Sequence, residues 1–600
     1  GSIVSKGSDF ANVLTYHRRL KILTERGREA GEVRIPAGKN SRVEGIEART
    51  IRPDGSVVPV PASEIHQRVV ARTRGWNEVA HVFHFPSVEP GAILEYRYQR
   101  TVDTFVFIEP WSFTQDYPVL VSKVAQAVPW GAEYAVSCHH CPDPKPVVTP
   151  FRDGQKRGSR HAWEVRDLPA RKDEPLSPPD RVTDTDLEMV LRFWAGVYWL
   201  QLDREERFFT DWESVGRFAS FGYDAAAKED LGALKEKVAG WVAGISEPEA
   251  RLKAVVAGVR RSTRYLGGDE VYGLARPVGD LLRDGTADNE ERAVLMAAAL
   301  RLAGFPSRIA LVAGRDGQPM FQNFPSLSQF SFAVTIASLP DGADLWIDPT
   351  ATWAPYDFLP WRASGASGLL LDKRRKNPMV SLPTRADTGL TRFDVRVTPT
   401  TGGRATLAVD VTFIGEPAVE MRELLVPAGA TEREDQVREW LETVGPSMPL
   451  TGLTIDALEE VDKPLRLHFT SEASGLTLRT DEALGVRACV FDCYDGRLPI
   501  AARREAPFYV DRGLRTMEMV TLVPPPGLTR ATLPPSGDAM SAIGGYTFGC
   551  SEKDDGTVEC GRALTLPRAR LPVTEADAVR AMFQKVAEFD RSGVLFAAPD

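Results

Sequence analysis

A long helix followed by strands is predicted by RDGTADNEERAVLMAAALRLAGFPSRIALV (residues 283–312), FSFAVTI (330–336) and DLWIDPTATW (344–353). Residues 289–303 are rich in alanine and leucine, which favours a helix. After Gly304 the apolar residues fall in short β-rich runs. Helices followed by an antiparallel sheet are typical of an α+β unit.

The chain around this unit divides into regions of different periodicity. Further helices are predicted near 185–200, 225–245 and 248–263. Residues from about 12 to 190, and again from 390 to 572, contain β-rich runs between Gly and Pro breaks, as β-sandwiches do. The basic, Pro-containing stretch at 371–383 predicts a linker or a sheet edge.

We therefore predict an α+β multidomain chain. Its parts are an N-terminal β-sandwich (1–184), a central α+β core (185–375) and a C-terminal β-sandwich (376–600). The last part ends in a predicted helix, whose apolar face consists of Val579, Met582, Phe583 and Val586.

Composition is that of an ordinary globular protein, with 43% hydrophobic and 26% charged residues among 600. A net charge of -9 is spread along the chain, and no Lys/Arg cluster interleaves with aromatic residues, so we expect no nucleic-acid partner. No apolar run approaches the roughly 20 residues that span a bilayer. Gly1 and Ser2 are typical of a cleaved tag, which leaves open a signal peptide or lipid anchor in the natural chain.

The six cysteines fall in three local pairs, Cys138/Cys141, Cys489/Cys493 and Cys550/Cys560. This spacing favours disulfides and an exported protein, although reduced thiols in the cytoplasm stay an alternative. The Asp-Gly turn at 555–556 predicts a hairpin that sets the last pair side by side.

The run Cys138-His139-His140-Cys141 offers four soft metal ligands. Adjacent ligands close one tetrahedron only with strain, and a second ligand pair of the kind found in structural zinc sites is missing nearby. We therefore expect a disulfide or a plain loop here, no metal site and no cofactor.

The order of helix, strand and Asp-Pro strand resembles the transglutaminase-like core of the papain-like superfamily. In that core a cysteine begins a buried helix, a histidine begins the next strand, and an aspartate follows in an Asp-Pro motif. TYHRRLKILTERG (15–27), IEARTIRPDGSVVPV (46–60) and FPSVEPGAILEYRYQ (85–99) look like the β-domain of unknown function that precedes such cores in many bacterial proteins. The resemblance implies a bacterial protein that is often exported.

Laid on this sequence, the family's cysteine falls at Asn289 and its histidine at Ser331, while Asp348 keeps the aspartate. A shift by one residue at Ser331 brings in Phe330 or Phe332, which are no better as bases. The eight histidines of the chain are His17, His66, His81, His84, His139, His140, His161 and His468. Residues 185–375 therefore contain neither histidine nor cysteine, so the core lacks its own thiol nucleophile and imidazole base.

Structural roles are also open to these positions. Asp288 followed by Glu291 is a capping-box pattern, so it predicts a helix start, with Asn289 as its solvated neighbour. Asp348 before Pro349 predicts a carboxylate that bonds the backbone of its own turn.

Aromatic residues gather in two places. Those at 192–212 are helix-spaced and predict core packing, whereas Trp346, Trp353, Tyr356 and Trp361 flank Asp348 and predict a retained binding pocket.

Three hypotheses follow. The first is a catalytically inactive transglutaminase-like protein that binds a protein or polysaccharide partner in the bacterial envelope, in the periplasm or at the cell surface. The second is an active cysteine-dependent amide hydrolase or acyltransferase, in which a thiol such as Cys489 or Cys493 reaches Asp348 from a flanking domain. The third is a metal-binding protein that uses the Cys138 to Cys141 run.

Overall fold

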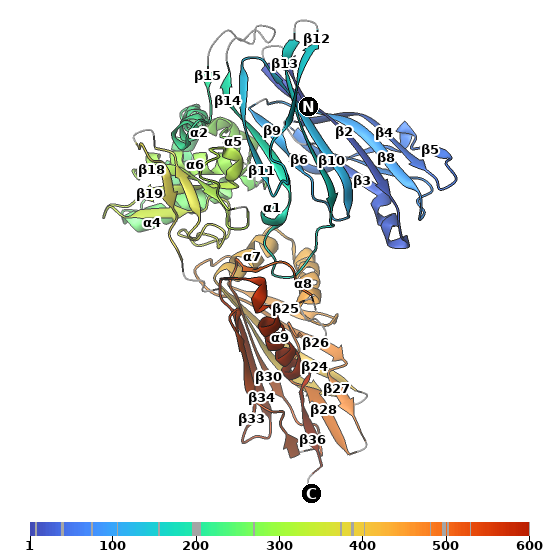
Figure 1. The fold of residues 1–600 in the computed structure, drawn as a ribbon. Helices are drawn as coiled ribbons and strands as arrows, with labels where there is room; N and C mark the ends of the chain where they lie inside the picture. Colours follow the sequence, from blue (N-terminus) through green and yellow to red (C-terminus); the bar gives the residue numbers. More distant parts are fainter. Residues whose placement is uncertain are drawn as a thin grey trace.

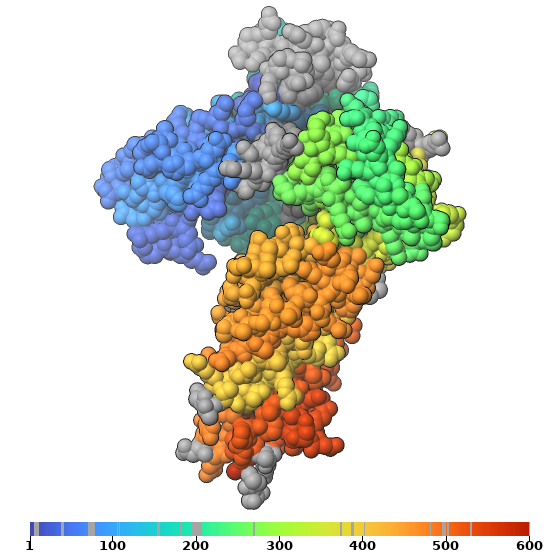
Figure 2. Space-filling model, turned by 180° about the vertical axis from the view of Figure 1, so that it is seen from behind, coloured from blue at the N-terminus to red at the C-terminus, as the bar shows by residue number. Residues whose placement is uncertain are grey.

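The computed structural model describes residues 1–600 except 7–8, 38–40, 74–75, 105, 154–155, 195–205, 268–270, 318, 373–374, 386–388, 401–402, 481, 495–499, 501–502, 529 and 599–600. The chain combines helices with many sheets, as predicted for a multidomain protein. N-terminal strands (blue) lie beside a helical group (green and yellow), and a long C-terminal mass (orange to red) extends below both (Figure 1; Figure 2 from behind). Among the described residues, no helix is long and apolar enough to cross a membrane.

The N-terminal strands form a large sheet with a smaller sheet packed near each end. In spatial order the large sheet is β12 (Val147–Asp153), β13 (Lys156–Leu168), β10 (Val119–Pro129), β1 (Ser2–Lys6), β2 (Asp9–Lys21), β8 (Ile93–Val102), β4 (Ser41–Ile51) and β5 (Val57–Pro59). The small sheets are β3 (Glu32–Ala37), β7 (Trp76–His84) and β6 (His66–Thr73), and β11 (Ala132–His139), β14 (Asp186–Trp194), β15 (Glu206–Arg207) and β9 (Phe107–Ser112). One apolar cluster joins β4 and β8 to β3 and β7, and another joins β10 and β13 to β9 and β14.

Strand β14 corrects the prediction of a helix near 185–200, the rest of which lies outside the described residues. This strand pairs with both β11 and β9. Leu187 and Met189 pack toward the large sheet, whereas Val190 and Leu191 enter the core of the helical group. A strand buried on both sides reads as a nearly continuous apolar run, which periodicity cannot distinguish from a helix. The N-terminal sheets and the helical group therefore share packing across residue 185.

The central mass combines helices with an antiparallel five-stranded sheet. The helices are α2 (Trp212–Ala226), α3 (Gly232–Trp241), α4 (Pro248–Ser262), α5 (Val278–Asp284) and α6 (Asn289–Leu302), preceded by the short α1 (Asp180–Thr183). The sheet order is β20 (Asp344–Ile347), β19 (Phe332–Ser338), β18 (Ser307–Ala313), β21 (Ser367–Leu370) and β22 (Met379–Ser381), and β16 (Arg264–Tyr265) pairs with β17 (Thr286–Ala287).

Several predictions for this central part are confirmed. The helices predicted at 248–263 and 289–303 are α4 and α6, and strands follow Gly304. The helix predicted at 225–245 is shorter, because α2 ends at 226 and α3 covers only 232–241. The stretch at 371–383 supplies the edge strand β22, so this sheet continues past residue 375.

The C-terminal mass has an eight-stranded sheet covered by helix α9 (Ala576–Arg591) and a small sheet. The order of the large sheet is β25 (Thr451–Asp456), β26 (Leu465–Ser474), β24 (Arg404–Ile414), β23 (Leu390–Pro399), β30 (Leu514–Leu522), β34 (Val558–Leu566), β33 (Gly544–Glu552) and β32 (Gly537–Ser541). The small sheet is β27 (Thr477–Arg479), β28 (Ala483–Arg487), β36 (Gly593–Ala597) and β31 (Arg530–Thr532), and β29 (Phe508–Val510) pairs with β35 (Ala569–Leu571).

Helix α9 buries the apolar face predicted for it, Val579, Met582, Phe583 and Val586. Two helices that the strand pattern did not predict, α7 (Glu416–Leu425) and α8 (Ala430–Val444), follow β24. They lie at the end of this mass that faces the other two (Figure 1).

All six cysteines are joined in the three predicted pairs. Cys550 and Cys560 lie directly opposite each other on β33 and β34, which confirms the predicted hairpin. Cross-links of this kind favour an oxidising compartment.

On the outer surface of the C-terminal sheet, His468 lies between two carboxylates. Its Nδ1 contacts Asp410 on the neighbouring strand β24, and its Nε2 lies 3.0 Å from an oxygen of Asp456 on β25. A ring that bonds a carboxylate through each nitrogen is favoured in its protonated form. Its pKa is accordingly raised, chiefly by the hydrogen bond to Asp410 and against the effect of desolvation.

We expect Asp410→Asn to lower the pKa of His468, because the variant loses the main group that stabilises the imidazolium. In the wild type the stabilisation from this group is complete below about pH 6.5, the unfolded pKa, and is lost as pH rises through the raised folded pKa. NMR titration of the histidine ring, with unfolding temperature measured across the same pH range, checks this. Asp538→Asn on the remote strand β32 is the control, and a wild-type His468 that titrates at or below pH 6.5 contradicts the prediction.

Candidate functional site

Asn289, which the sequence predicts at the family's cysteine position, begins helix α6. The residue is only 2% exposed. Its Oδ1 accepts a hydrogen bond from the Ala333 N–H, and its Nδ2 donates to the Ala333 carbonyl at 3.3 Å. The expectation of a solvated neighbour is therefore wrong, because the carboxamide joins α6 to both main-chain groups of one residue on β19.

The predicted capping box is confirmed around it. The Glu291 N–H donates to Asp288 Oδ1 at 2.9 Å, and the Asp288 N–H donates to Glu291 Oε2 at 3.1 Å. Arg276 donates to both carboxylate oxygens of Glu291, at 2.6 and 2.9 Å. These contacts fix the N-terminal turn of α6 and with it the position of Asn289.

Glu290, the next residue, is also buried, and it bonds the segment around Tyr272 and Gly273. Its carboxylate accepts hydrogen bonds from the Tyr223 hydroxyl and from the N–H groups of Tyr272 (2.9 Å) and Gly273 (2.7 Å). Burial raises the pKa of Glu290 to about 7, although these three donors favour the charged form.

Ser331 precedes β19, and its hydroxyl contacts the end of the neighbouring strand β18. Its Oγ accepts a hydrogen bond from the Gly314 N–H at 3.1 Å and lies 3.5 Å from the Val312 carbonyl. The main-chain groups that Asn289 bonds belong to Ala333, two positions further on. The methyl side chain of Ala333 can act neither as an acid nor as a base.

Asp348 follows β20 and bonds its own turn, as predicted. Its Oδ1 accepts from the Thr350 N–H at 2.8 Å and from the Thr350 hydroxyl at 2.7 Å. In the described chain, no hydrogen bond links the side chains of Asn289, Ser331 and Asp348. Each of the three instead bonds main chain close to it.

Two buried arginines hold the loop that leaves Asp348. Arg260 on α4 donates to the carbonyls of Asp348 (2.6 Å), Ala354 (2.8 Å) and Pro355 (3.0 Å). Arg292, one helical turn beyond Asn289, donates to the Thr350 carbonyl at 2.7 Å and to the Arg260 carbonyl at 3.0 Å. Burial lowers the pKa of both guanidinium groups to about 10, so both stay charged at neutral pH.

Helix α7, the first helix of the C-terminal part, contacts the same loop through two glutamates. Glu423 accepts a hydrogen bond from the Trp353 N–H, and Glu416 accepts from the Trp361 N–H at 3.0 Å. Burial raises the pKa of Glu423, against the attraction of the charged Arg292 and Arg260. The segment after Asp348 is thus tied to the core on one side and to α7 on the other.

The four aromatic residues predicted to form a pocket are spread over different surroundings. Trp346 packs against the outer cluster of the five-stranded sheet, and Trp353 stacks under Arg261 at 4.9 Å. Tyr356 donates to Glu249 at 3.1 Å. Trp361 alone of the four lines a cavity, which extends toward α7.

Of the aromatic stretch at 192–212, residues 195–205 lie outside the described part. Phe209 is buried in the core, and Trp212 packs edge-on against Phe330. The prediction of core packing holds for these two residues.

The other cysteine-bearing sites are closed by disulfides. Cys138 and Cys141 are bonded to each other, and His139 between them packs on Phe321 at 4.2 Å. Cys489 and Cys493 are bonded to each other as well. Neither pair presents a thiolate to a metal ion or to a substrate in this form.

Sequence reasoning missed Arg260, Arg292, Glu423 and Ala333. Arg260 lies in the motif VRRS (259–262), which reads as a solvated basic helix end. Arg292 lies in the polar first turn of α6, and Glu423 lies in a helix that was not predicted. No local pattern marks them, because each acts through partners that are distant in sequence.

Known proteins resemble the chain in two ways. Residues 8–172 match the family model of DUF3857, a domain of unknown function, which confirms the N-terminal part of the resemblance. No curated protein sequence matches the chain at a significant level. Among solved structures, a protein from Parabacteroides distasonis described as a "putative protease" is 14% identical with a TM-score of 0.60, covering 99% of this chain and 97% of that one. The periplasmic domain of TgpA from Pseudomonas aeruginosa, bound to ethylmercury, matches at 16% identity and a TM-score of 0.15, covering 51% of this chain and 89% of its own. The first of these similarities shows a shared fold along nearly the whole chain.

Proposed function

We propose that this chain is a catalytically inactive protein with a transglutaminase-like, papain-like core between two β-sandwich domains, and that it binds a protein or polysaccharide partner. The pairing of the Asn289 carboxamide with Ala333 carries the proposal. A thiol at this position would be activated by the helix N-terminus and an imidazole, whereas a carboxamide bonded at both ends is no nucleophile.

The histidine count supports the same conclusion. Residues 185–375 contain no histidine, and the residue that faces Asn289 is alanine. Asp348 therefore has no ring in this segment to orient, and its bonds to Thr350 satisfy one of its oxygens within its own turn. A single carboxylate without nucleophile or base does not perform acyl transfer.

The alternative of an imported cysteine nucleophile has less support. Cys489 is fully buried in the C-terminal core and bonded to Cys493. The loop between them is anchored by Glu518, which accepts from the Phe491 N–H at 2.9 Å, and by Arg562, which donates to the Phe491 carbonyl. Delivering a thiol to Asp348 would require reduction of the Cys489–Cys493 disulfide and a rearrangement of this anchored loop.

The metal-binding alternative is also weakened by a disulfide. Cys138 and Cys141 would have to be reduced before they could ligate an ion. The His140 ring meanwhile bonds the Val182 carbonyl at 2.9 Å.

The three disulfides support an exported location, in the periplasm or at the cell surface. In the periplasm or at the cell surface, the catalytically inactive core would act as a binding or scaffold element.

We expect Asn289→Ala to lower the free energy of unfolding by about 2–4 kcal/mol, because two buried main-chain groups lose their partner. Calorimetric unfolding measures the change. Asn323→Ala, at an exposed position of the same part, is the matched control and should change the stability little. A stability loss no larger than that of the control would show that Asn289 does not hold α6 to β19.

We expect the purified chain to show no amine incorporation into casein and no amidase activity, with or without reductant. Titration with a thiol reagent should find no free thiol in the native protein and six after reduction in denaturant. Activity that alkylation abolishes would overturn the proposal. If Cys489→Ser/Cys493→Ser also abolished that activity, the imported nucleophile would replace it.

A further inference from the structure

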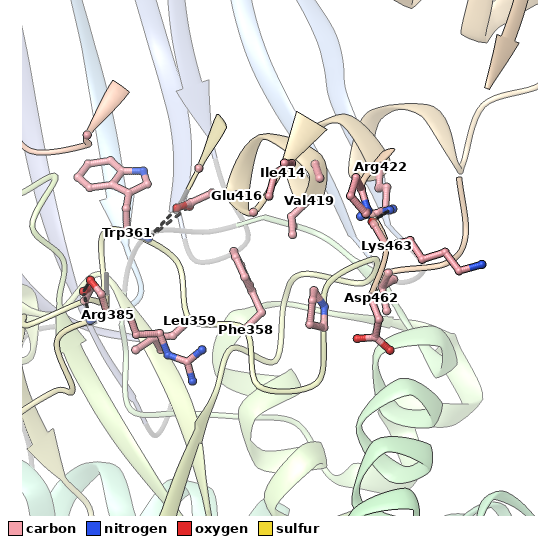
Figure 3. A pocket seen from close by; sticks show the side chains of 18 of the residues that line it. Phe358, Leu359, Trp361, Arg385, Ile414, Glu416, Val419, Arg422, Asp462 and Lys463 are labelled. Atoms are coloured by element: carbon pink, nitrogen blue, oxygen red, sulfur yellow. Dashed lines mark hydrogen bonds between the residues drawn. The ribbon is translucent and has the colours of Figure 1, made fainter. Parts of the chain in front are cut away.

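A cavity of about 350 Å³ lies where the central part meets the C-terminal part. Phe358, Leu359 and Trp361, from the loop after Asp348, form one side, and they are faced by Ile414, at the end of β24, and Val419, in the first turn of α7 (Figure 3). Cavities of roughly 300–1,000 Å³ are typical of small-molecule sites.

One end of the cavity carries three arginines. Arg315 lies 3.3 Å from Asp511, and Arg385 lies 3.5 Å from Asp357. Arg568 donates only to the Ser364 carbonyl, at 3.4 Å, and no carboxylate of the described chain lies within ion-pair distance of it. Among the described residues, the Arg568 guanidinium at this end therefore has no acidic partner.

The carboxylates that line the cavity do not balance these charges. Asp511 is shared between Arg315 and Arg570, which lies 3.0 Å from it outside the cavity. Glu416 is bonded to the Trp361 N–H (Figure 3). Asp462 lies at the opposite end from Arg385 (Figure 3).

The electrostatics of Arg315 agree with an excess of positive charge. Its pKa is lowered to about 10, first by burial and next by repulsion from Arg568, with a smaller contribution from Arg570 and against the attraction of Asp511. An anion between Arg315 and Arg568 would relieve this repulsion.

The apolar side of the cavity is held in place before any ligand arrives. The Asp348 N–H donates to the Phe358 carbonyl at 3.2 Å, and Arg260 holds the carbonyl of Pro355. Glu416 fixes Trp361 from the opposite side. A preformed apolar wall facing fixed cationic groups lowers the ordering cost of binding.

We propose that this cavity binds a carboxylate carried on an apolar body, of the kind that a peptide presents at its C-terminal residue. The carboxylate would lie against Arg568 and Arg315, and the apolar group against Phe358, Leu359 and Trp361. Planar guanidinium groups suit a carboxylate, and the apolar wall requires a hydrophobic substituent. The inference is independent of the proposed loss of catalysis, because Asn289, Ser331 and Asp348 do not line the cavity.

Calorimetric titration of the full chain with N-acetyl-phenylalanine tests the site, beside its uncharged amide and phenyl phosphate. We expect the acid to bind at least about tenfold more tightly than the amide, because only the acid forms charge-assisted hydrogen bonds. Arg568→Gln should weaken binding of the acid about tenfold or more. Arg570→Gln removes an equal charge outside the cavity and should change the affinity less than about threefold.

Peptides that end in phenylalanine, free or amidated at the C-terminus, separate the two sources of this ligand. Tighter binding of the free peptide than of N-acetyl-phenylalanine identifies a chain terminus, and the reverse order identifies a small acid; both support the site. Equal affinity for acid and amide, tighter binding of phenyl phosphate, no binding of the acid, or an equal effect of the two arginine variants would overturn the proposal. Because Arg568 is exposed, Arg568→Gln should keep the unfolding temperature of the wild type.

Discussion

Two buried guanidinium groups fix the segment on which the candidate site and the cavity both depend. Arg260 and Arg292 donate to main-chain carbonyls of Asp348 and of the residues that follow it. Burying a charge is costly unless its hydrogen bonds are satisfied, and here carbonyl oxygens satisfy them while Asp348 and Glu423 supply opposite charge nearby. The loop that follows Asp348 is therefore held in one conformation by the helices beneath it. Its outer side is left to contact α7 and to line the cavity.

The same reasoning applies to the N-terminus of α6. A thiol at this position would offer one weak donor, whereas the carboxamide of Asn289 offers a donor and an acceptor that match the two main-chain groups of Ala333. A buried peptide group left without partners is expensive, so a residue that satisfies it stabilises the contact between helix and strand. On our proposal, Asn289 has no reactivity but forms a structural bond to β19. Because this bond needs no histidine, the loss of a histidine from the site leaves it unchanged.

Local patterns in the sequence predicted local structure well. The capping box at Asp288, the turn at Asp348 and the hairpin at Cys550 each depend on residues close together in the chain, and all three are confirmed. Strand β14 was read as a helix because burial on both faces removes the alternation that identifies a strand. Asn289 was read as solvated because its partner, Ala333, lies 44 residues away. Contacts of this range are set by packing, and one-dimensional periodicity does not contain them.

The loop after Asp348 links the central core to α7, since its two sides contact different parts of the chain. Inward, its carbonyls receive Arg260 and Arg292; outward, its N–H groups reach Glu423 and Glu416 on α7. These main-chain groups are bonded within the protein and are therefore not free to bind a substrate. The side chains of Phe358, Leu359 and Trp361, further along the loop, line the cavity. On our proposal, ligand binding in this region therefore falls to side chains at the junction with the C-terminal part, where no carboxylate of the described residues lies within ion-pair distance of the Arg568 guanidinium.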